Sequence, residues 1–177
     1  MAKTTITHVP GLRRMSLRVN PNGEALVRAP MRTTEAQIQK FLDTHTLWIR
    51  KQRSKMSGFV RLTREQISDF RDRAEKFLPR RVAELAEELD FRYQRVTFRH
   101  QKSRWGSCSH RNVISLNIEL MRLPKKLRDY IIVHELTHTV HKHHQTAFWN
   151  HLERVFPGAL ELDEEMKEWK IGYEKRD

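Results

Sequence analysis

The chain contains the stretch His134-Glu135-Leu136-Thr137-His138. Two histidines four residues apart lie on one face of an α-helix, so their imidazoles can bind one metal ion. The glutamate beside the first histidine then reaches a water molecule on that metal. A random shuffle of this composition would contain the pattern on the order of once in twenty, so the surrounding sequence has to decide whether it marks a site.

The surrounding sequence predicts a helix that begins near Pro124 and carries the motif. Proline suits the first turn of a helix, and apolar residues such as Leu127 and Leu136 recur at helical spacing. A catalytic zinc takes three protein ligands and leaves a fourth position for water. His144 is the candidate third ligand, but a continuous helix would rotate it away from the face that carries His138. The chain must therefore turn between His138 and His144.

The predicted turn resembles the one in metzincins, which follow H-E-x-x-H with x-x-G-x-x-H. The glycine position is His141 here, so we expect a turn in which this histidine adopts positive φ at some strain. No Met-turn follows, and the chain is not assigned to the metzincins. His141 and His143 are interpreted as turn residues or groups behind the ligands, since a catalytic zinc rarely takes four protein ligands.

Glu135 and Cys108 each have two interpretations. Glu135 is either a solvated helix residue or the general base, and its place beside two metal-spaced histidines favours the base. Cys108 is either part of a structural zinc site or a buried strand residue, and its isolation favours the strand.

The rest of the chain predicts an α+β fold. Strands are expected at 95–99, 104–108 and 113–117, and together they should form a small antiparallel sheet. After the motif, a helix from Phe148 should stop at Pro157-Gly158, and a last helix is expected at 162–173.

The first part of the chain predicts a hairpin and two long helices. Residues 15–19 and 25–28 alternate apolar and polar side chains around Asn20-Pro21-Asn22-Gly23. A helix is expected at about 34–55, capped by Thr33 or Thr34, followed by a loop at 54–58. A second helix is expected at 64–89, with a capping box at Thr63 and a kink or break at Pro79.

Length and composition suit one compact protein, with an N-terminal hairpin and helix module at 1–60 and a catalytic core at 61–177. The single cysteine among 177 residues excludes an intrachain disulfide, and the start of the chain lacks the apolar run of a signal peptide. We therefore expect a cytoplasmic location. Mean hydropathy is −0.74, and no segment approaches the roughly 18 apolar residues of a membrane span, so no membrane partner is expected.

The chain is strongly basic. Its 34 Lys and Arg exceed its 22 Asp and Glu, which gives a formal charge of +12. Such an excess is either a solvated surface or a field that attracts phosphate-bearing partners, so a nucleic acid or a nucleotide is a possible partner. The sequence does not indicate an oligomeric state.

Several motifs together resemble the YgjP family of zinc metallopeptidase-like proteins, which is related to the SprT-like proteases. The resemblance covers nearly the whole chain and rests on residues 17–23, 27–30, 102–109, 114–117 and 130–138, and on His144 with Phe148-Trp149. It implies a zincin-like fold, Zn²⁺ on His134, His138 and His144, Glu135 as the catalytic acid and base, and a peptide or protein substrate.

The chain departs from the family pattern in two places. Family members carry a longer segment with its own strands after the first helix, where this chain has only residues 56–62. They also tend to have Ser-Pro after the third histidine, where this chain has Gln145-Thr146. The first difference concerns the N-terminal module, and the second leaves the metal ligands in place.

The expected function is a zinc-dependent peptidase in which Glu135 deprotonates a zinc-bound water that attacks a carbonyl. Further contacts with the substrate or its oxyanion are expected from residues close in sequence, namely Arg104, Tyr130, His141 and His143. The strand at 114–117 is expected to offer an edge to an extended peptide.

Two other functions compete with the peptidase. A metal-dependent hydrolase of nucleotide phosphoanhydrides would use the basic residues Lys102, Arg104 and Arg111, although such enzymes commonly bind Mg²⁺ through carboxylates. A nucleic-acid-binding protein with a structural zinc would bind in a salt-dependent way and would not need Glu135.

Overall fold

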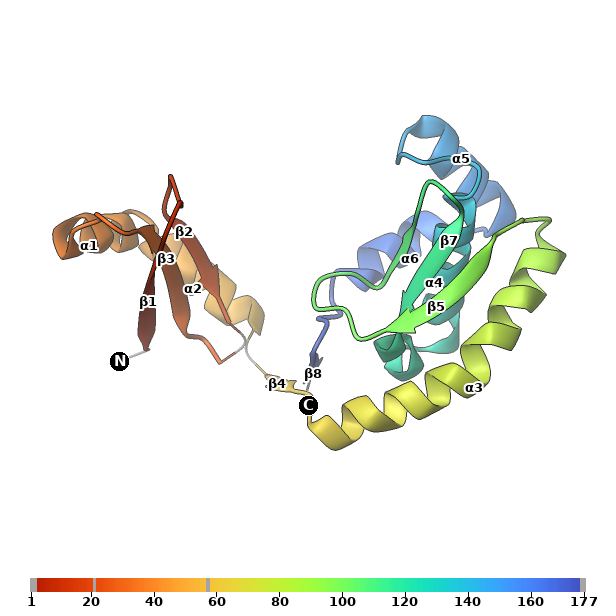
Figure 1. Cartoon of the computed structure of the whole chain (residues 1–177), viewed down its shortest axis with the longest axis horizontal. Coiled ribbons are helices and arrows are strands. Elements are labelled where there is room, and N and C mark those ends of the chain that lie inside the picture. The colour runs from red at the N-terminus through yellow and green to blue at the C-terminus, as the bar shows by residue number, and fades with distance from the viewer. Residues whose placement is uncertain (1–2, 21, 57, 176–177) are drawn as a thin grey trace. The chain divides into compact units, whose positions relative to one another are not determined.

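A computed structural model of the chain describes residues 3–20, 22–56 and 58–175 (Figure 1). The fold is mixed α+β, which confirms the predicted class. The chain divides into two compact units, one of Met1–Arg61 with Tyr173–Asp177 and one of Leu62–Gly172. That these units are the predicted N-terminal module and catalytic core stays a prediction. In the described part of the chain, no helix combines the length and the apolar character that crossing a bilayer requires.

The first unit contains a sheet with strand order β1-β3-β2. Strands β2 (Ser16–Val19) and β3 (Ala25–Pro30) are antiparallel, which confirms the predicted hairpin, although Pro21 of its turn lies outside the described residues. Strand β1 (Thr4–Val9) pairs with β3 in parallel and was not predicted.

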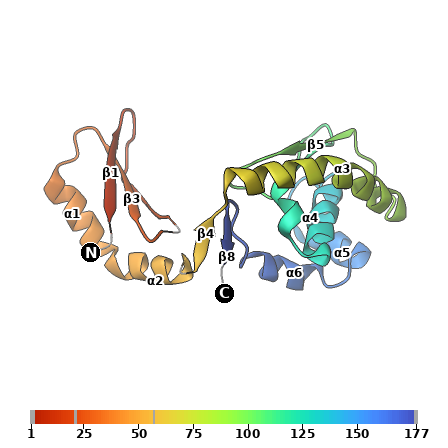
Figure 2. The same ribbon diagram turned by 90° about the horizontal axis from the view of Figure 1, so that it is seen from below.

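Two helices, α1 (Glu35–Thr44) and α2 (Thr46–Met56), follow one another in this unit (Figure 2). Thr34, one of the two expected caps, caps α1 through a capping box with Gln37, but the single helix predicted at 34–55 is wrong because the helix is interrupted at His45. There the ring Nδ1 lies 2.7 Å from the Phe41 carbonyl oxygen. Because α2 continues to residue 56, the predicted loop at 54–58 is shorter than expected.

The core of the first unit is small. Ile38 of α1 packs on the sheet face that carries Val27 and Ala29. A short two-stranded sheet completes the unit, with β4 (Phe59–Arg61) antiparallel to β8 (Tyr173–Lys175).

The second unit begins with α3 (Arg64–Glu88), capped by the predicted box at Thr63. The helix is continuous through Pro79 and changes direction midway along its length, so a bend rather than a break is found (Figure 1). Its buried side, which includes Leu78 and Leu85, faces the core.

The second unit has a three-stranded sheet with strand order β5-β7-β6. Strands β6 (Gly106–Cys108) and β7 (Val113–Asn117) are antiparallel, but β5 (Arg95–Arg99) and β7 are parallel. The predicted antiparallel sheet is therefore wrong for one of its two pairings. The expectation that residues 114–117 form an edge is also wrong, because β7 is the central strand and β6 lies at the edge.

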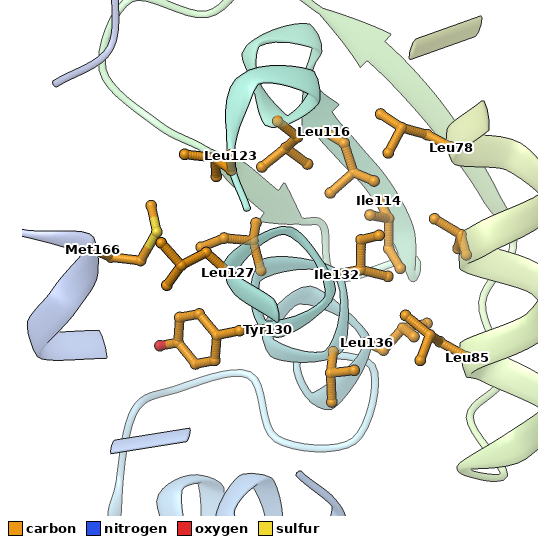
Figure 3. Close-up of a cluster of buried hydrophobic side chains, with 14 of the residues drawn as sticks. Leu78, Leu85, Ile114, Leu116, Leu123, Leu127, Tyr130, Ile132, Leu136 and Met166 are labelled. Carbon is orange, nitrogen blue, oxygen red and sulfur yellow. The ribbon is translucent and has the colours of Figure 1, made fainter. Parts of the chain in front are cut away.

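Helix α4 (Lys125–Thr137) carries the motif, as predicted, and follows a short 3₁₀ helix, η1 (Ile118–Arg122). It is buried along most of its length, since nine of its 13 residues are buried, among them Ile132, Val133 and Leu136. Figure 3 shows Leu136 near Leu85 of α3 and Leu127 near Met166 of the last helix. The histidine motif thus lies on a largely buried helix of this unit.

The remaining helices of the second unit are α5 (Thr146–Val155) and α6 (Ala159–Met166). Helix α5 ends before Pro157-Gly158, as predicted, but the last helix occupies 159–166 instead of 162–173. The two ends of the unit meet, since the Leu62 amide donates to the Gly172 carbonyl at 2.9 Å. The Gly172 amide in turn donates to the buried Glu119 carboxylate, 2.8 Å from Oε2.

Candidate metal centre

The last turn of α4 presents two histidines, and the chain then reverses to present a third. The helix ends at Thr137, whose carbonyl accepts hydrogen bonds from the amides of Val140 at 3.1 Å and His141 at 2.9 Å. His144 follows this reversal and precedes α5. Of the described residues other than glycine, Asp90 and Asn112 have positive φ, so the expected left-handed conformation at His141 is wrong and the turn forms without that strain.

The three imidazole rings converge through their Nε2 atoms. His144 Nε2 lies 2.9 Å from His134 Nε2 and 3.1 Å from His138 Nε2. One nitrogen from each of the three residues fits within a span of 4.8 Å. Ligand nitrogens bonded to a tetrahedral zinc at about 2.05 Å are about 3.3 Å apart. The rings are thus spaced to hold one metal ion, and the group contains no carboxylate.

The Nδ1 atoms of His134 and His138 have hydrogen-bond partners, which leaves the Nε2 atom of each ring free to bind a metal. His138 Nδ1 donates to the His141 carbonyl at 2.9 Å. Tyr130 donates its hydroxyl hydrogen to Asp163 Oδ1 at 2.8 Å, so the same hydroxyl oxygen can accept from His134 Nδ1 at 3.3 Å. Hydrogen bonds of this kind fix the tautomer and orientation of metal-binding histidines.

The surroundings of the rings favour their neutral form. Burial lowers the pKa of His134 to about 3, helped by the nearby positive charges that His138 and His144 would carry if protonated. Burial also lowers the pKa of His138, although its hydrogen bond to the His141 carbonyl opposes the shift. A neutral imidazole is the form that binds a metal ion, so these two residues are ready to act as ligands.

Glu135 is 6% exposed, and its Oε2 atom has no hydrogen-bond partner among the described residues. Burial raises the pKa of Glu135 to about 8, against the opposing charge of Arg104. An unpartnered buried carboxylate oxygen costs free energy, and such groups cluster at functional sites. The Glu135 carboxylate follows His134 directly in the sequence, and this is the position of the general base in an H-E-x-x-H motif.

Gly106 of β6 lies directly against Glu135. A Cβ atom at this position would come within 2.6 Å of both Cγ and Oε1 of the glutamate. Strand β6 therefore acts as a wall that confines the Glu135 side chain, and that wall needs a residue without a side chain. Gly106 was expected only as part of a strand, because a contact between residues 106 and 135 has no local signal.

The other residues expected at the site occupy different surroundings. Arg104 lies near enough to Glu135 to affect its pKa, whereas Tyr130 is 1% exposed and lies behind His134. His141 Nε2 lies 3.1 Å from Nδ1 of His151, and His143 is exposed. Their roles as substrate contacts stay predictions.

Cys108 lies on β6 and is half-buried, which agrees with the strand interpretation. Burial raises the pKa of its thiol. It does not belong to the group of three histidines, the one potential metal-binding group found among the described residues. Asp163 was missed because it lies on another helix, 33 positions after Tyr130.

Comparisons with known proteins point to one family. The family model described as YgjP-like, metallopeptidase domain, matches the chain over residues 13–70 and 61–169. Among solved structures, the metallopeptidase zymogen abylysin from Pyrococcus abyssi is 28% identical, with a TM-score of 0.44, over 49% of this chain and 90% of that one. The zymogen jannalysin from Methanocaldococcus jannaschii is 24% identical, with a TM-score of 0.43 and the same coverages. No curated protein matches the chain.

Proposed function

Because the chain belongs to the YgjP-like metallopeptidase family, we propose that it is a zinc-dependent peptidase with a zincin-like catalytic unit. Family membership makes it a hydrolytic enzyme that works with a metal ion. In this proposal the metal ligands are His134, His138 and His144. Glu135 is the general base. The observation that carries the proposal is the convergence of three Nε2 atoms beside a buried carboxylate with an unpartnered oxygen.

The donor set supports zinc and a peptidase. Three neutral imidazoles with a fourth position open are a common ligand set of catalytic zinc. Mg²⁺ prefers carboxylate and phosphate oxygens, and the histidine group contains no carboxylate. These points favour the peptidase over the phosphoanhydride hydrolase. The buried, unpartnered Glu135 favours catalysis over a purely structural zinc.

Glu135 performs the proton transfers in the proposed reaction. When bound, the zinc ion would polarise the carbonyl of the scissile peptide bond and lower the pKa of a coordinated water to about 7. Glu135 takes a proton from the attacking water and passes it to the leaving amine. Its burial supports this role, because a buried carboxylate with an unpartnered oxygen is a stronger base than an exposed one.

The neighbouring residues hold these groups in position. Tyr130, itself held by Asp163, orients His134, and the His141 carbonyl orients His138. In the proposal, Arg104 stabilises the negative charge that develops on the carbonyl oxygen of the substrate. Its positive charge already acts on the neighbouring Glu135.

Replacing Glu135 with Gln tests the proposal. The purified variant should keep its zinc, measured by elemental analysis, and should hydrolyse peptides at least about 10²-fold more slowly, because general acid and base catalysis contributes about 10²–10⁴-fold. Glu165→Gln, at an exposed position on α6, is the matched control and should keep full activity. Peptide hydrolysis by Glu135→Gln at the native rate would refute the mechanism.

The same proteins also test the alternatives. Release of pyrophosphate or phosphate from nucleoside triphosphates would support the phosphoanhydride hydrolase. Salt-dependent binding to nucleic acid that is unchanged in Glu135→Gln would support the structural-zinc function. A cytoplasmic location stays a prediction.

A further inference from the structure

A groove follows strand β2 in the first unit. It consists of two adjoining hollows of about 580 Å³ and about 440 Å³ that share Met15 and Phe41. On one side lie β2 and the segment before it, and on the other lie α1 and the start of α2. We call this the β2 groove, and its remaining lining residues are Arg13, Arg14, Ser16, Leu17, Pro30, Thr33, Gln37, Lys40, Thr44, His45 and Trp48.

Strand β2 is an open edge of its sheet. It pairs with β3 on one side, and no described strand pairs with its other side. An edge strand presents backbone N–H and C=O groups that can pair with another extended chain. A groove between an edge strand and a helix is the arrangement that strand-adding peptides use, with alternate side chains entering the groove.

The rim of the β2 groove is basic. Arg13, Arg14 and Lys40 line it, and no acidic residue does. All three residues are exposed, and none of them forms an ion pair with a described residue. Residues 1–61 hold 12 Lys and Arg against three Asp and Glu, and this difference gives +9 of the formal +12 charge of the chain. The groove therefore attracts an acidic partner.

The floor of the β2 groove is apolar and aromatic. Met15, Leu17 and Phe41 are half-buried along it, and Trp48 is 40% exposed at one end. The His45 ring packs on Phe41 with its centroid 4.3 Å away, which holds the aromatic floor in place. Apolar surface rimmed by polar groups marks an interaction site, and Trp and Tyr often anchor such contacts.

We propose that the β2 groove binds an extended acidic polypeptide segment, which adds as a strand to β2. Its apolar side chains enter the groove toward Phe41 and Trp48, and its carboxylates lie beside Arg13, Arg14 and Lys40. The role of this contact in recruiting substrate rests on the proposed peptidase function, but the binding itself does not.

The open strand edge favours a polypeptide over a nucleic acid. A peptide backbone can pair with the backbone N–H and C=O groups of β2 in a regular ladder of hydrogen bonds. A nucleic acid would use only the positive charge and the exposed Trp48 ring. The membership of the chain in a peptidase family agrees with a polypeptide partner.

The test measures fluorescence anisotropy of labelled peptides with the full, zinc-loaded chain carrying Glu135→Gln, so that no peptide is cleaved. The probe has large apolar residues at every second position of a central stretch, and acidic residues flank this stretch so that they can reach Arg13 and Arg14 before β2. We expect saturable binding that weakens about tenfold in the double variant Arg13→Glu with Arg14→Glu, since two exposed ion pairs are lost and replaced by repulsion. Trp48→Ala should weaken it as well.

The matched control is Arg50→Glu with Arg61→Glu. It changes the charge of the same unit by the same amount, but both residues are exposed, and neither lies on β2 or lines the β2 groove. Binding should be unchanged in this control. A probe with N-methyl groups on alternate residues, which cannot complete the ladder, should bind at least tenfold more weakly.

Three results would overturn the proposal. The first is no binding of the acidic probe, and the second is equal binding of the N-methylated probe. The third is an equal loss in both charge-reversal variants, together with tighter binding of a single-stranded oligonucleotide of the same charge. Because the readout is binding in an inactive variant, a failed peptidase mechanism leaves this result unchanged, and the reverse also holds.

Discussion

The two units of the chain differ in where they place apolar and charged groups. The unit of residues 62–172 is called the catalytic unit after its proposed role. It surrounds α4 with buried side chains from α3, β7, α5 and α6, and its charge is nearly balanced, with 20 Lys and Arg against 17 Asp and Glu. The first unit has a core cluster of three buried residues, Val27, Ala29 and Ile38, and a formal charge of +9 over residues 1–61.

This difference follows from what each unit has to hold. Burying an unpaired carboxylate such as Glu135 costs several kcal/mol, and that cost is offset only by a large, well-packed core. A surface that attracts a partner by charge and an open strand edge needs no such core. The catalytic unit therefore needs its large core to hold the buried Glu135 in place, whereas the charged groups of the first unit stay exposed to solvent and need little core.

The largest expected effect separates the cores of the two units. Leu116→Ala, at a fully buried position on β7, should lower the unfolding free energy of the catalytic unit by about 2–5 kcal/mol. Ile38→Ala should destabilise the first unit by a similar amount while zinc binding by the catalytic unit stays unchanged. Hydrogen exchange resolved by peptide mass measures both, and a single loss of protection shared by both units in either variant would contradict the comparison.

The second effect concerns the wall at β6. Gly106 has no left-handed backbone, so Gly106→Ala adds only a methyl group, which must displace Glu135. We expect about a 10²-fold lower kcat with unchanged zinc content, since a displacement of about 1 Å can cost that much. Ser107→Ala, on the same strand, is the control.

Shortening Glu135 to Asp separates this contact from general damage to the strand. Removal of a methylene makes room for the added methyl group. The Gly106→Ala change should therefore cost much less in the Glu135→Asp background than in the native one. Equal costs in the two backgrounds would show that Gly106 does not position the glutamate.

The third effect is a pH dependence that arises in the catalytic unit. The pKa of Glu135 is raised to about 8 in the folded protein, above the ordinary value of 4.5, so its ionisation destabilises the metal-free fold as pH rises through that interval. Glu135→Gln should stabilise the metal-free protein, and the gain should be about 3 kcal/mol smaller near pH 5.5 than near pH 8. Urea denaturation at both pH values measures this, and a gain independent of pH would refute the raised pKa.

The smallest effect concerns the support of His134. Tyr130→Phe removes the hydroxyl between Asp163 and the ring, and we expect about tenfold weaker zinc binding, at the low end for such supporting groups. Competition with a chelator measures the affinity. Tyr93→Phe, in the same core, should bind zinc as the native protein does.

Local signals predicted much of this structure. The hairpin, a helix cap at Thr33 or Thr34, the capping box at Thr63 and the helix after Pro124 were all expected, because each depends on residues close in sequence. Residues 134 and 138 were expected to share a helix face for the same reason. The reversal before His144 was expected because a straight helix would place it elsewhere.

Long-range and marginal features were not predictable. Strand β1 is exposed along most of its length, so no apolar face signalled it, and β4 with β8 pair across more than 100 residues. The break at His45 involves neither proline nor glycine. The parallel β5–β7 pairing and the contact between Gly106 and Glu135 arise only when distant segments pack together.

The hydrogen bond from Leu62 to Gly172 means that the catalytic unit starts and finishes at one point. It is therefore inserted into the first unit, whose chain leaves after β4 and returns at β8. Domains whose ends are adjacent tolerate circular permutation and transfer into other proteins. Residues 62–172 could thus be transferred as one domain, together with the histidine site, into another protein.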